Sequence, residues 1–375
     1  MSEPICRWGI LGAADIARKN WQAIRNASNC TLTAVASRDL EKCRRFVAQC
    51  QSHVPFNPPP QACGSYEELL SLDGVDAVYI PLPTVVRKPW AIRAAEAGKH
   101  VLVEKPVGAT ADDVRDILAA CRRNGVQFMD GVMFMHSRRL DRIREVLDDG
   151  ESVGRVQRIA SHFAFPGSEE FFEHDIRTHS DLEPLGCLGD LGWYNIGFTL
   201  WVMNWQLPAQ VCGHILTEHH RNDSPAPVPA DFSAELFYAD GASASFCCSF
   251  RTANEQWAHV SGTEGSLYIP DFVLPHYGSE LTFDLSNSKF NVRGCDFNME
   301  GHTRRVAVPE YSNSAETSQE ANMFREFAEL VLAGQPDPHW GAIALRTQLV
   351  LDACLQSARS AGGSIALPAS AETRK

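Results

Sequence analysis

The chain has 375 residues, of which 44% are hydrophobic and 21% charged, a globular composition with enough apolar material for two domains. Lys and Arg number 34 against 46 Asp and Glu, and the resulting net charge of −12 disfavours nucleic acid and anionic lipid as partners. No apolar run reaches the ~18 residues of a membrane span, and the first residues lack the order of a signal peptide, so we expect a cytoplasmic protein that does not bind membranes.

Short apolar runs alternate with helical segments over the first 130 residues. The apolar runs predict strands at 6–11, 32–37, 75–83, 100–106 and 126–131. The segments between them predict helices at 15–26, 40–50, 65–71, 89–98 and 111–125. A proline-rich stretch at 53–61 cannot be helical and is expected to be a loop. This alternation indicates an α/β fold, with a doubly wound parallel sheet of the Rossmann type as a domain at residues 1–130.

The pattern changes after Asp130. A helix is predicted at 137–150, and two strands at 155–165 and 209–219. Period-two runs around Asp240-Gly241 and Glu264-Gly265 predict two hairpins of a large, mostly antiparallel sheet. Two more helices, at 319–334 and 340–363, end a C-terminal α+β domain at 131–367. Residues 368–375 are expected to be a disordered tail.

The twelve cysteines are too sparse for a disulfide scaffold. They include no CxxC pair, and the neighbours Cys247 and Cys248 would point to opposite faces of a strand. We therefore expect reduced thiols that serve as small core residues.

A dinucleotide-binding turn is predicted where the first strand meets the first helix. Gly12 and Ala17 fit the outer positions of a GxGxxG/A fingerprint, whereas Ala14 replaces its middle glycine. The free N–H groups of the following helix would bind an anion. An ordinary strand–helix turn is the alternative.

The end of the second strand favours NADP over NAD. An NAD site has an acidic residue here for the ribose 2′-hydroxyl, but this strand ends in Ser37 and Arg38, which suit a 2′-phosphate. Asp39 follows, so NAD stays an alternative, as does a solvated Arg38 at a helix start.

Lys105 follows the apolar strand HVLV and precedes Pro106. The carboxyl end of a parallel strand borders the ligand crevice of an open α/β sheet. A lysine there supplies positive charge beside a reacting carbonyl or alkoxide, although a surface lysine after a strand is the plainer interpretation.

Several of these segments together resemble a known family. The segments are GILGAADIA, AVASRDLEK, YIPLP, AIRAAEAGKHVLVEKP and LGDLGWYNI. They resemble the glucose–fructose oxidoreductase / inositol dehydrogenase / rhizopine catabolism (Gfo/Idh/MocA) family, over the first 205 residues by motif and beyond by pattern. MDGVMFMHSRR and LEPLGCLGDLGWYNI are similar to its branch of dihydrodiol dehydrogenases and NADP-dependent xylose dehydrogenases.

The resemblance implies the chemistry of particular residues. Lys105 corresponds to the family's EKP lysine, near the nicotinamide and the reacting oxygen. Asp190 and Tyr194 correspond to its D-x-G-x-H segment, with tyrosine in place of histidine. A free tyrosine has a pKa around 10, and a neighbouring ammonium favours its phenolate, so Tyr194 is predicted to be the acid/base and Lys105 to assist it. Asp190 would orient the lysine or a substrate hydroxyl.

The resemblance also implies residues that bind the cofactor and the substrate. The cofactor residues are Gly12, Ala13, Ala14, Asp15, Ile16, Ser37, Arg38, Pro81, Leu82, Thr84, Glu104 and Lys105. Arg177 is a substrate candidate or an exposed loop charge, and Trp193 lines the pocket or packs in the core. No metal is expected, because the spacings of the histidines and aspartates between His174 and Asp181 match no zinc signature.

The function predicted from these residues is an NADP-dependent oxidoreductase of EC class 1.1.1. It would transfer a hydride between nicotinamide and a sugar or cyclic vicinal diol. One alternative is a catalytically silent NADP-binding regulator or scaffold. Another is a glycosidase or lyase that retains NAD. As in relatives, a homodimer or higher homo-oligomer through the C-terminal sheet is expected.

Overall fold

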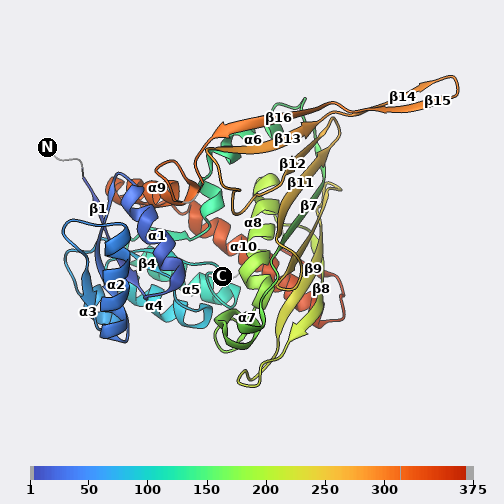
Figure 1. Ribbon diagram of the computed structural model, residues 1–375. Helices are drawn as coiled ribbons and strands as arrows, with labels where there is room; N and C mark the ends of the chain where they lie inside the picture. The colour runs from blue at the N-terminus through green and yellow to red at the C-terminus, as the bar shows by residue number, and fades with distance from the viewer. Residues whose placement is uncertain (1–3, 313, 369–375) are drawn as a thin grey trace. The chain divides into compact units, whose positions relative to one another are not determined.

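The computed structural model describes residues 4–312 and 314–368 (Figure 1). The chain divides into two compact units. Unit 1 comprises residues 1–136, 179–184 and 313–349, and unit 2 comprises residues 137–178, 185–312 and 350–375. The tail was predicted at 368–375, and its residues 369–375 lie outside the described residues. Among the described helices, none is long and apolar enough to cross a membrane.

Unit 1 is built on a parallel sheet with strand order β3-β2-β1-β4-β5-β6. Its strands are β1 (Cys6–Leu11), β2 (Cys30–Ala36), β3 (Gln61–Cys63), β4 (Ala77–Ile80), β5 (His100–Val103) and β6 (Phe128–Asp130). Its helices include α1 (Asp15–Asn26), α2 (Leu40–His53), α3 (Tyr66–Leu70), α4 (Thr84–Glu96) and α5 (Ala111–Arg123). The predicted doubly wound domain is confirmed, and its strand order reverses between β1 and β4, where such folds bind ligands.

The proline-rich loop lies between α2, which ends at His53, and β3, which the sequence did not predict and which begins at Gln61 and pairs with β2 through Ala62. One local prediction in unit 1 is wrong. Helix α4 begins at Thr84, five residues before Pro89, rather than at the proline. A proline inside a helix costs about 3 kcal/mol, and here the first turn of α4 is held by a buried ion-pair network described below.

Helix α9 (Gln319–Ala333) lies on the β1 strand of unit 1, although it is distant in sequence. The Trp8 ring contacts the rings of Phe324 and Phe327, with centroids 4.9 and 5.0 Å away. Lys19 of α1 forms an ion pair with Glu320 at 2.6 Å. The compact units therefore differ from the contiguous segments 1–130 and 131–367, because an apolar face of a late helix completes the core of unit 1.

Unit 2 is built on a large mixed sheet with strand order β16-β13-β12-β11-β7-β10-β9-β8-β17 (Figure 1). The sequence predicted β7 (Val156–Ala164), β8 (Gln210–His219), β9 (Val228–Phe237), β10 (Ser243–Ser249), β11 (Glu255–Gly262) and β12 (Ser266–Ile269). It did not predict β13 (Glu280–Ser286), β14 (Lys289–Arg293), β15 (Asp296–Glu300), β16 (Thr303–Pro309) and β17 (Ile365–Ala366). The described pairs of this sheet are antiparallel except β7 with β10, which confirms the mostly antiparallel prediction.

Described helices cover one face of this sheet. Helix α8 (Trp193–Val202) and the π-helix η3 (Leu188–Gly192) before it contact β7 and β10. Side chains on that face, such as Phe246, Val260 and Phe283, are at most 3% exposed. Alternate residues point to the opposite face, where Tyr268 is 39% exposed. We call this second surface the outer face of the sheet.

The other helices of unit 2 connect these strands or border them. They are α6 (Arg138–Asp148) and α7 (Glu169–His174), while α10 (His339–Arg359) belongs to unit 1 up to Leu349 and to unit 2 from Val350. Every cysteine lies in the described part of the chain, and each is a free thiol. Burial raises the pKa of the Cys63 and Cys121 thiols to about 12, as expected for inert core residues.

Candidate active site

The turn after β1 has the geometry of a phosphate-binding loop. Gly12 has φ +131°, and a Cβ added to it would lie 3.0 Å from a methyl group of Leu82. Its amide donates to the carbonyl of Ala36 at 3.0 Å, which ties the turn to the end of β2. Only glycine adopts this conformation readily, which explains why glycine occupies the first position of the fingerprint.

The N-terminus of α1 is open to an anion. Ala14 occupies the N-cap with extended backbone, and no side chain of the described residues caps the helix. The side chain of alanine cannot accept a hydrogen bond, and although the Ala17 amide donates to the Ala14 carbonyl at 3.1 Å, no side chain occupies the N–H groups of Asp15 and Ile16 that a ligand would meet.

Ser37, Arg38 and Asp39, which follow β2, have different hydrogen-bond partners. The Asp39 carboxylate caps α2 by accepting from the amide of Lys42 at 3.0 Å, and this hydrogen bond lowers the pKa of Asp39. Ser37 Oγ accepts from the amide of Asp39 at 3.3 Å, while Arg38 is exposed. The acidic side chain is thus used as a helix cap, whereas the guanidinium of the exposed Arg38 is hydrogen-bonded with the Tyr66 hydroxyl and partly offsets the rise in the pKa of Tyr66 that burial causes.

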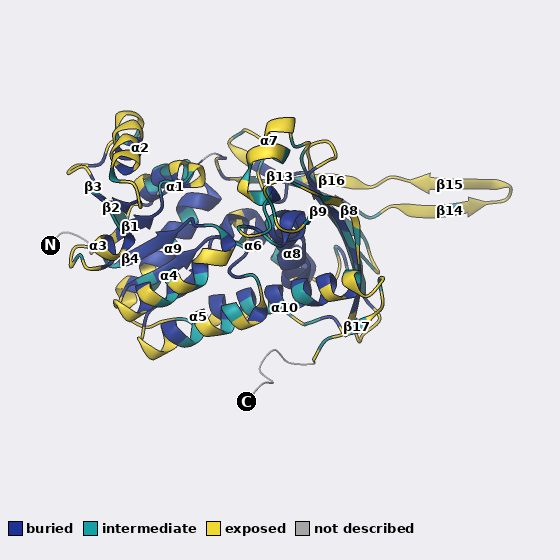
Figure 2. Ribbon diagram, turned by 90° about the horizontal axis from the view of Figure 1, so that it is seen from below, coloured by how far each residue is buried: buried dark blue, intermediate teal, exposed yellow. Residues whose placement is uncertain are grey.

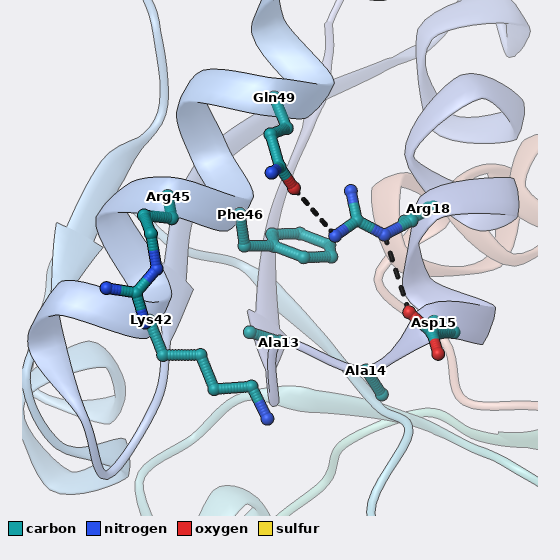
Figure 3. A pocket seen from close by; sticks show the side chains of 8 residues that line it. All are labelled: Ala13, Ala14, Asp15, Arg18, Lys42, Arg45, Phe46 and Gln49. Atoms are coloured by element: carbon teal, nitrogen blue, oxygen red, sulfur yellow. Dashed lines mark hydrogen bonds and ion pairs between the residues drawn. The ribbon is translucent and has the colours of Figure 1, made fainter.

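A basic pocket lies between α1 and α2 (Figure 3). Its volume is about 250 Å³, and its lining residues are Ala13, Ala14, Asp15, Arg18, Lys42, Arg45, Phe46 and Gln49. Arg18 lies over the Phe46 ring, 4.9 Å from its centroid, and donates to Gln49 at 2.9 Å. Three cationic side chains face a single carboxylate there, so the pocket suits an anionic group beside the dinucleotide turn.

Arg18, Lys42 and Arg45 were missed by the sequence analysis. Lys42 and Arg45 are three residues apart in the predicted helix, which is the spacing of one helix face, so this signal was readable. Arg18 comes from another helix, and its place in the pocket follows from the packing of α1 on α2, which sequence spacing does not reveal.

Lys105 is held at the end of β5 by a buried carboxylate. Glu104 is 8% exposed and accepts from the Tyr79 hydroxyl at 2.5 Å, while its other oxygen accepts from the Lys105 amide at 3.3 Å. Burial and the charge of Glu104 raise the pKa of Tyr79 well above its usual value. Glu104 therefore positions the strand end, and the half-buried Lys105 follows it directly.

Thr84 belongs to a buried network that the sequence did not predict. Its amide donates to Glu183 Oε1 at 2.9 Å, and its hydroxyl donates to the other oxygen of the same carboxylate. Arg87 donates to Thr84 Oγ1 at 2.9 Å and lies 3.6 Å from Glu183. Arg87 also donates to the carbonyls of Leu82 and Pro106. The network joins the loops after β4 and β5, where cofactor residues Pro81, Leu82 and Lys105 were predicted.

Unit 2 carries the other predicted catalytic residues. Asp190 lies in η3 and Tyr194 in the first turn of α8, and π-helical turns of this kind often occur at functional sites. The Tyr194 ring packs against Phe163 of β7 with centroids 5.6 Å apart, and the residue is 6% exposed. The sequence spacing thus places Asp190 and Tyr194 within about one helical turn of each other.

Arg177 lies between two carboxylates. Its Nε is 3.1 Å from Asp190 Oδ2, and its Nη1 is 3.2 Å from Asp175 Oδ1. The side chain remains 42% exposed. Arg177 is therefore paired with the candidate catalytic Asp190, and its predicted contact with the substrate stays a prediction. Trp193 is 1% exposed, which agrees with packing in the core.

No cluster of metal ligands occurs in the described part of the chain: the histidine, cysteine and acidic side chains there form no group of three or more that could hold an ion. Lys105 and the cofactor residues belong to unit 1, and Asp190 and Tyr194 to unit 2. Their meeting over a nicotinamide is part of the proposal below.

Comparison with known proteins identifies the family. Residues 6–132 match the model of an oxidoreductase family with an NAD-binding Rossmann fold, and residues 140–268 match the GFO/IDH/MocA C-terminal domain. The chain therefore belongs to the Gfo/Idh/MocA oxidoreductase family, as the sequence motifs predicted.

Several relatives match over most of their length. The dTDP-3,4-didehydro-2,6-dideoxy-alpha-D-glucose 3-reductase of Actinomadura kijaniata is 28% identical over 94% of this chain and 96% of its own. The trans-1,2-dihydrobenzene-1,2-diol dehydrogenase of Mus musculus is 30% identical over 95% and 97%. A solved 3-ketoreductase from Actinomadura kijaniata, in complex with NADP and TDP-benzene, has a TM-score of 0.76 at 26% identity, covering 95% of this chain and 98% of that one.

Proposed function

We propose that the protein is an NADP-dependent oxidoreductase that transfers a hydride between nicotinamide and a CH–OH or C=O group of a sugar or cyclic vicinal diol. The observation that carries the proposal is the joint presence of Lys105, Asp190 and Tyr194 on the motifs of a dehydrogenase family. Relatives named as a sugar 3-reductase, an NADP-dependent D-xylose 1-dehydrogenase and a dihydrodiol dehydrogenase support the substrate class.

The residues of unit 1 fit a dinucleotide with a 2′-phosphate. The positive φ of Gly12 and the close methyl group of Leu82 disfavour any side chain at this turn, and the uncapped α1 terminus suits the pyrophosphate. Arg38 and the basic pocket of Arg18, Lys42 and Arg45 suit the 2′-phosphate. When bound, the nicotinamide accepts or donates the hydride.

The remaining chemistry is assigned to the chain's own side chains. Tyr194 takes the proton from the substrate hydroxyl in oxidation and returns it in reduction. The Lys105 ammonium stabilises the phenolate of Tyr194 and the developing charge on the substrate oxygen. Asp190, paired with Arg177, orients a substrate hydroxyl or the lysine. A lysine and a tyrosine have also been replaced in solved structures of the related 3-ketoreductase.

A turnover screen tests this function. Xylose, glucose, anhydrofructose, trans-dihydrodiols and a dTDP-linked keto sugar are each offered with NADP(H) and with NAD(H), and absorbance of the reduced nicotinamide is followed. We expect net turnover with at least one of them, faster with NADP(H). Tight NADPH binding without any turnover would support a silent regulator. Cofactor retained through purification, without net reduction, would support a glycosidase or lyase.

Cofactor choice is tested by Arg38→Ala. We expect the KM for NADP to rise about 10- to 100-fold and that for NAD to change little, since a charge-assisted hydrogen bond to phosphate is worth about 1.5–3 kcal/mol. Arg44→Ala is the matched control, because Arg44 lies in α2, just after the segment that carries Arg38, pairs with Glu41 at 2.6 Å and does not line the pocket. Equal losses for both cofactors would reject a phosphate role for Arg38.

We also propose that the protein works in the cytoplasm and forms a homodimer through the outer face of its large sheet. The free thiols support a reducing compartment. Small side chains such as Ala160, Ser233 and Ser245 occupy the middle strands of the outer face, where a second sheet could approach closely.

A further inference from the structure

The strands β14 and β15 form a two-stranded ribbon that projects beyond the edge of the large sheet (Figures 1 and 2). We call this segment, Lys289–Glu300, the arm. It turns at Gly294 and Cys295, and Gly294 has φ +62°. An isolated two-stranded ribbon is at best marginally stable in water, because it has no core to bury its side chains. The arm is therefore expected to pack on another surface.

The two faces of the arm differ sharply in polarity. Directly opposed residues share a face, so the pairs Phe290–Met299 and Val292–Phe297 make one side entirely apolar. These four side chains are 52–68% exposed. The other side carries the polar pairs Lys289–Glu300, Asn291–Asn298 and Arg293–Asp296. Such alternation is typical of a ribbon with one covered face and one solvated face.

The apolar side of the arm continues the outer face of the sheet. The arm extends the pair β13–β16 without a change of register, since Ser286 opposes Thr303 and Lys289 opposes Glu300 at the same offset. Side chains alternate along a strand, so Phe290 lies on the side of Asp284 and Ser286, opposite the buried Phe283 and Leu285. A body that covers the outer face would therefore also meet the apolar side of the arm.

The outer face itself offers an aromatic surface near that edge. His162 stacks with Trp257, with ring centroids 6.1 Å apart, and His259 lies beside Tyr268 at 6.4 Å. Burial lowers the pKa of both His162 and His259, so neutral rings are favoured there. Phenylalanine and methionine side chains pack well on such aromatic surfaces.

We propose that the arm of one protomer packs its apolar side against the outer face of a second copy of this chain, in a two-fold dimer with reciprocal arms. This proposal rests on the homodimer proposed above and adds the arm as the element that stabilises the dimer. The arm carries two basic and two acidic side chains, so it approaches a second copy of this acidic chain without net repulsion.

The surface area of the contact supports a second copy of this chain as the partner of the arm. The four apolar side chains expose on the order of 400 Å². With an equal area covered on the partner and two reciprocal arms, the contact amounts to on the order of 1,600 Å², the size of a standard specific interface. In a two-fold dimer the contact between arm and outer face occurs twice, once for the arm of each protomer, whereas a single unrelated partner would make it only once.

The first test measures the dissociation constant of the dimer by sedimentation equilibrium. The double variant Phe290→Ser/Phe297→Ser is expected to raise this constant at least about 100-fold, since buried aromatic anchors dominate interface energies. The control is Asn291→Ser/Asn298→Ser on the polar side, which should leave it within about threefold. Circular dichroism and the unfolding temperature check that both variants stay folded.

The second test uses Cys295 at the tip of the arm, which is exposed whereas the other cysteines are buried or half-buried. A maleimide–benzophenone attached there should cross-link to the outer-face strands of the other protomer, and Cys295→Ser should abolish this product. A wild-type monomer would overturn both the arm and the dimer. A dimer that the Phe290/Phe297 variant does not weaken, or cross-links confined to one chain or to arm against arm, would overturn the arm alone. Turnover of the wild-type enzyme reports on the proposed function independently.

Discussion

Replacing Tyr194 by phenylalanine is expected to lower kcat by about 10²- to 10⁴-fold, the usual contribution of a positioned acid/base group. The substitution removes only the hydroxyl, and the ring keeps its edge-on contact with Phe163 in the core of unit 2. NADPH affinity should change little, because the cofactor residues lie in unit 1. Stopped-flow turnover with the best substrate from the screen, together with NADPH fluorescence titration, gives both quantities.

Tyr238→Phe is the matched control for this variant. Tyr238 is also 6% exposed and lies in unit 2, and its hydroxyl has no hydrogen-bond partner among the described residues. The Tyr238→Phe variant should therefore keep the kcat of the wild-type protein. An unchanged rate for Tyr194→Phe would reject the acid/base assignment, and an equal fall in both variants would indicate a packing effect instead.

Local patterns in the sequence predicted two elements of unit 1 to the residue. Strand β1 and helix α1 begin and end where predicted, and most other elements of the parallel sheet were placed to within a few residues. Helix α5 begins with a capping box in which Thr110 and Asp113 satisfy each other's backbone amides. Such elements carry their own start and stop signals within a few residues, so tertiary contacts need not be known.

The elements that were missed depend on distant partners. Helix α4 begins at Thr84 because Glu183, 99 residues later, accepts from its amide and hydroxyl. Helix α9 was predicted as a helix, but its place on Trp8 was not, since an apolar face does not indicate which sheet it covers. Apolar and polar residues alternate along both strands of the arm, which is a pattern typical of strands. This pattern is a weak signal in strands whose two faces are both exposed.

The same distinction applies to the site. Lys105, Asp190 and Tyr194 were predicted from motifs, and their roles stay predictions. Arg177 could be placed beside Asp190 only by the fold of the loop at Ile176–Thr178. Arg18 joined the pocket through helix packing. Residues that act through contacts between elements are therefore the ones that sequence reasoning is least able to find.

Glu183→Ala is expected to lower the free energy of unfolding by about 3–5 kcal/mol, the cost of removing one partner from a buried ion pair. Glu183 and Arg87 have side chains only 12% and 7% exposed, so the Arg87 guanidinium would stay buried without its carboxylate, and the Thr84 amide and hydroxyl would lose their acceptor. The first turn of α4 would loosen because Pro89 already weakens that helix. Urea unfolding followed by circular dichroism measures the change.

Glu41→Ala provides the comparison for this loss. Glu41 pairs with Arg44 at 2.6 Å, but both side chains are at least 60% exposed, so removing the carboxylate should cost less than about 1 kcal/mol. A similar small cost for Glu183→Ala would show that water reaches Arg87 and that the network does not hold the loops after β4 and β5. A large loss would instead make Glu183 the residue that fixes the loops at Leu82 and Pro106, because Arg87 donates to both of their carbonyls.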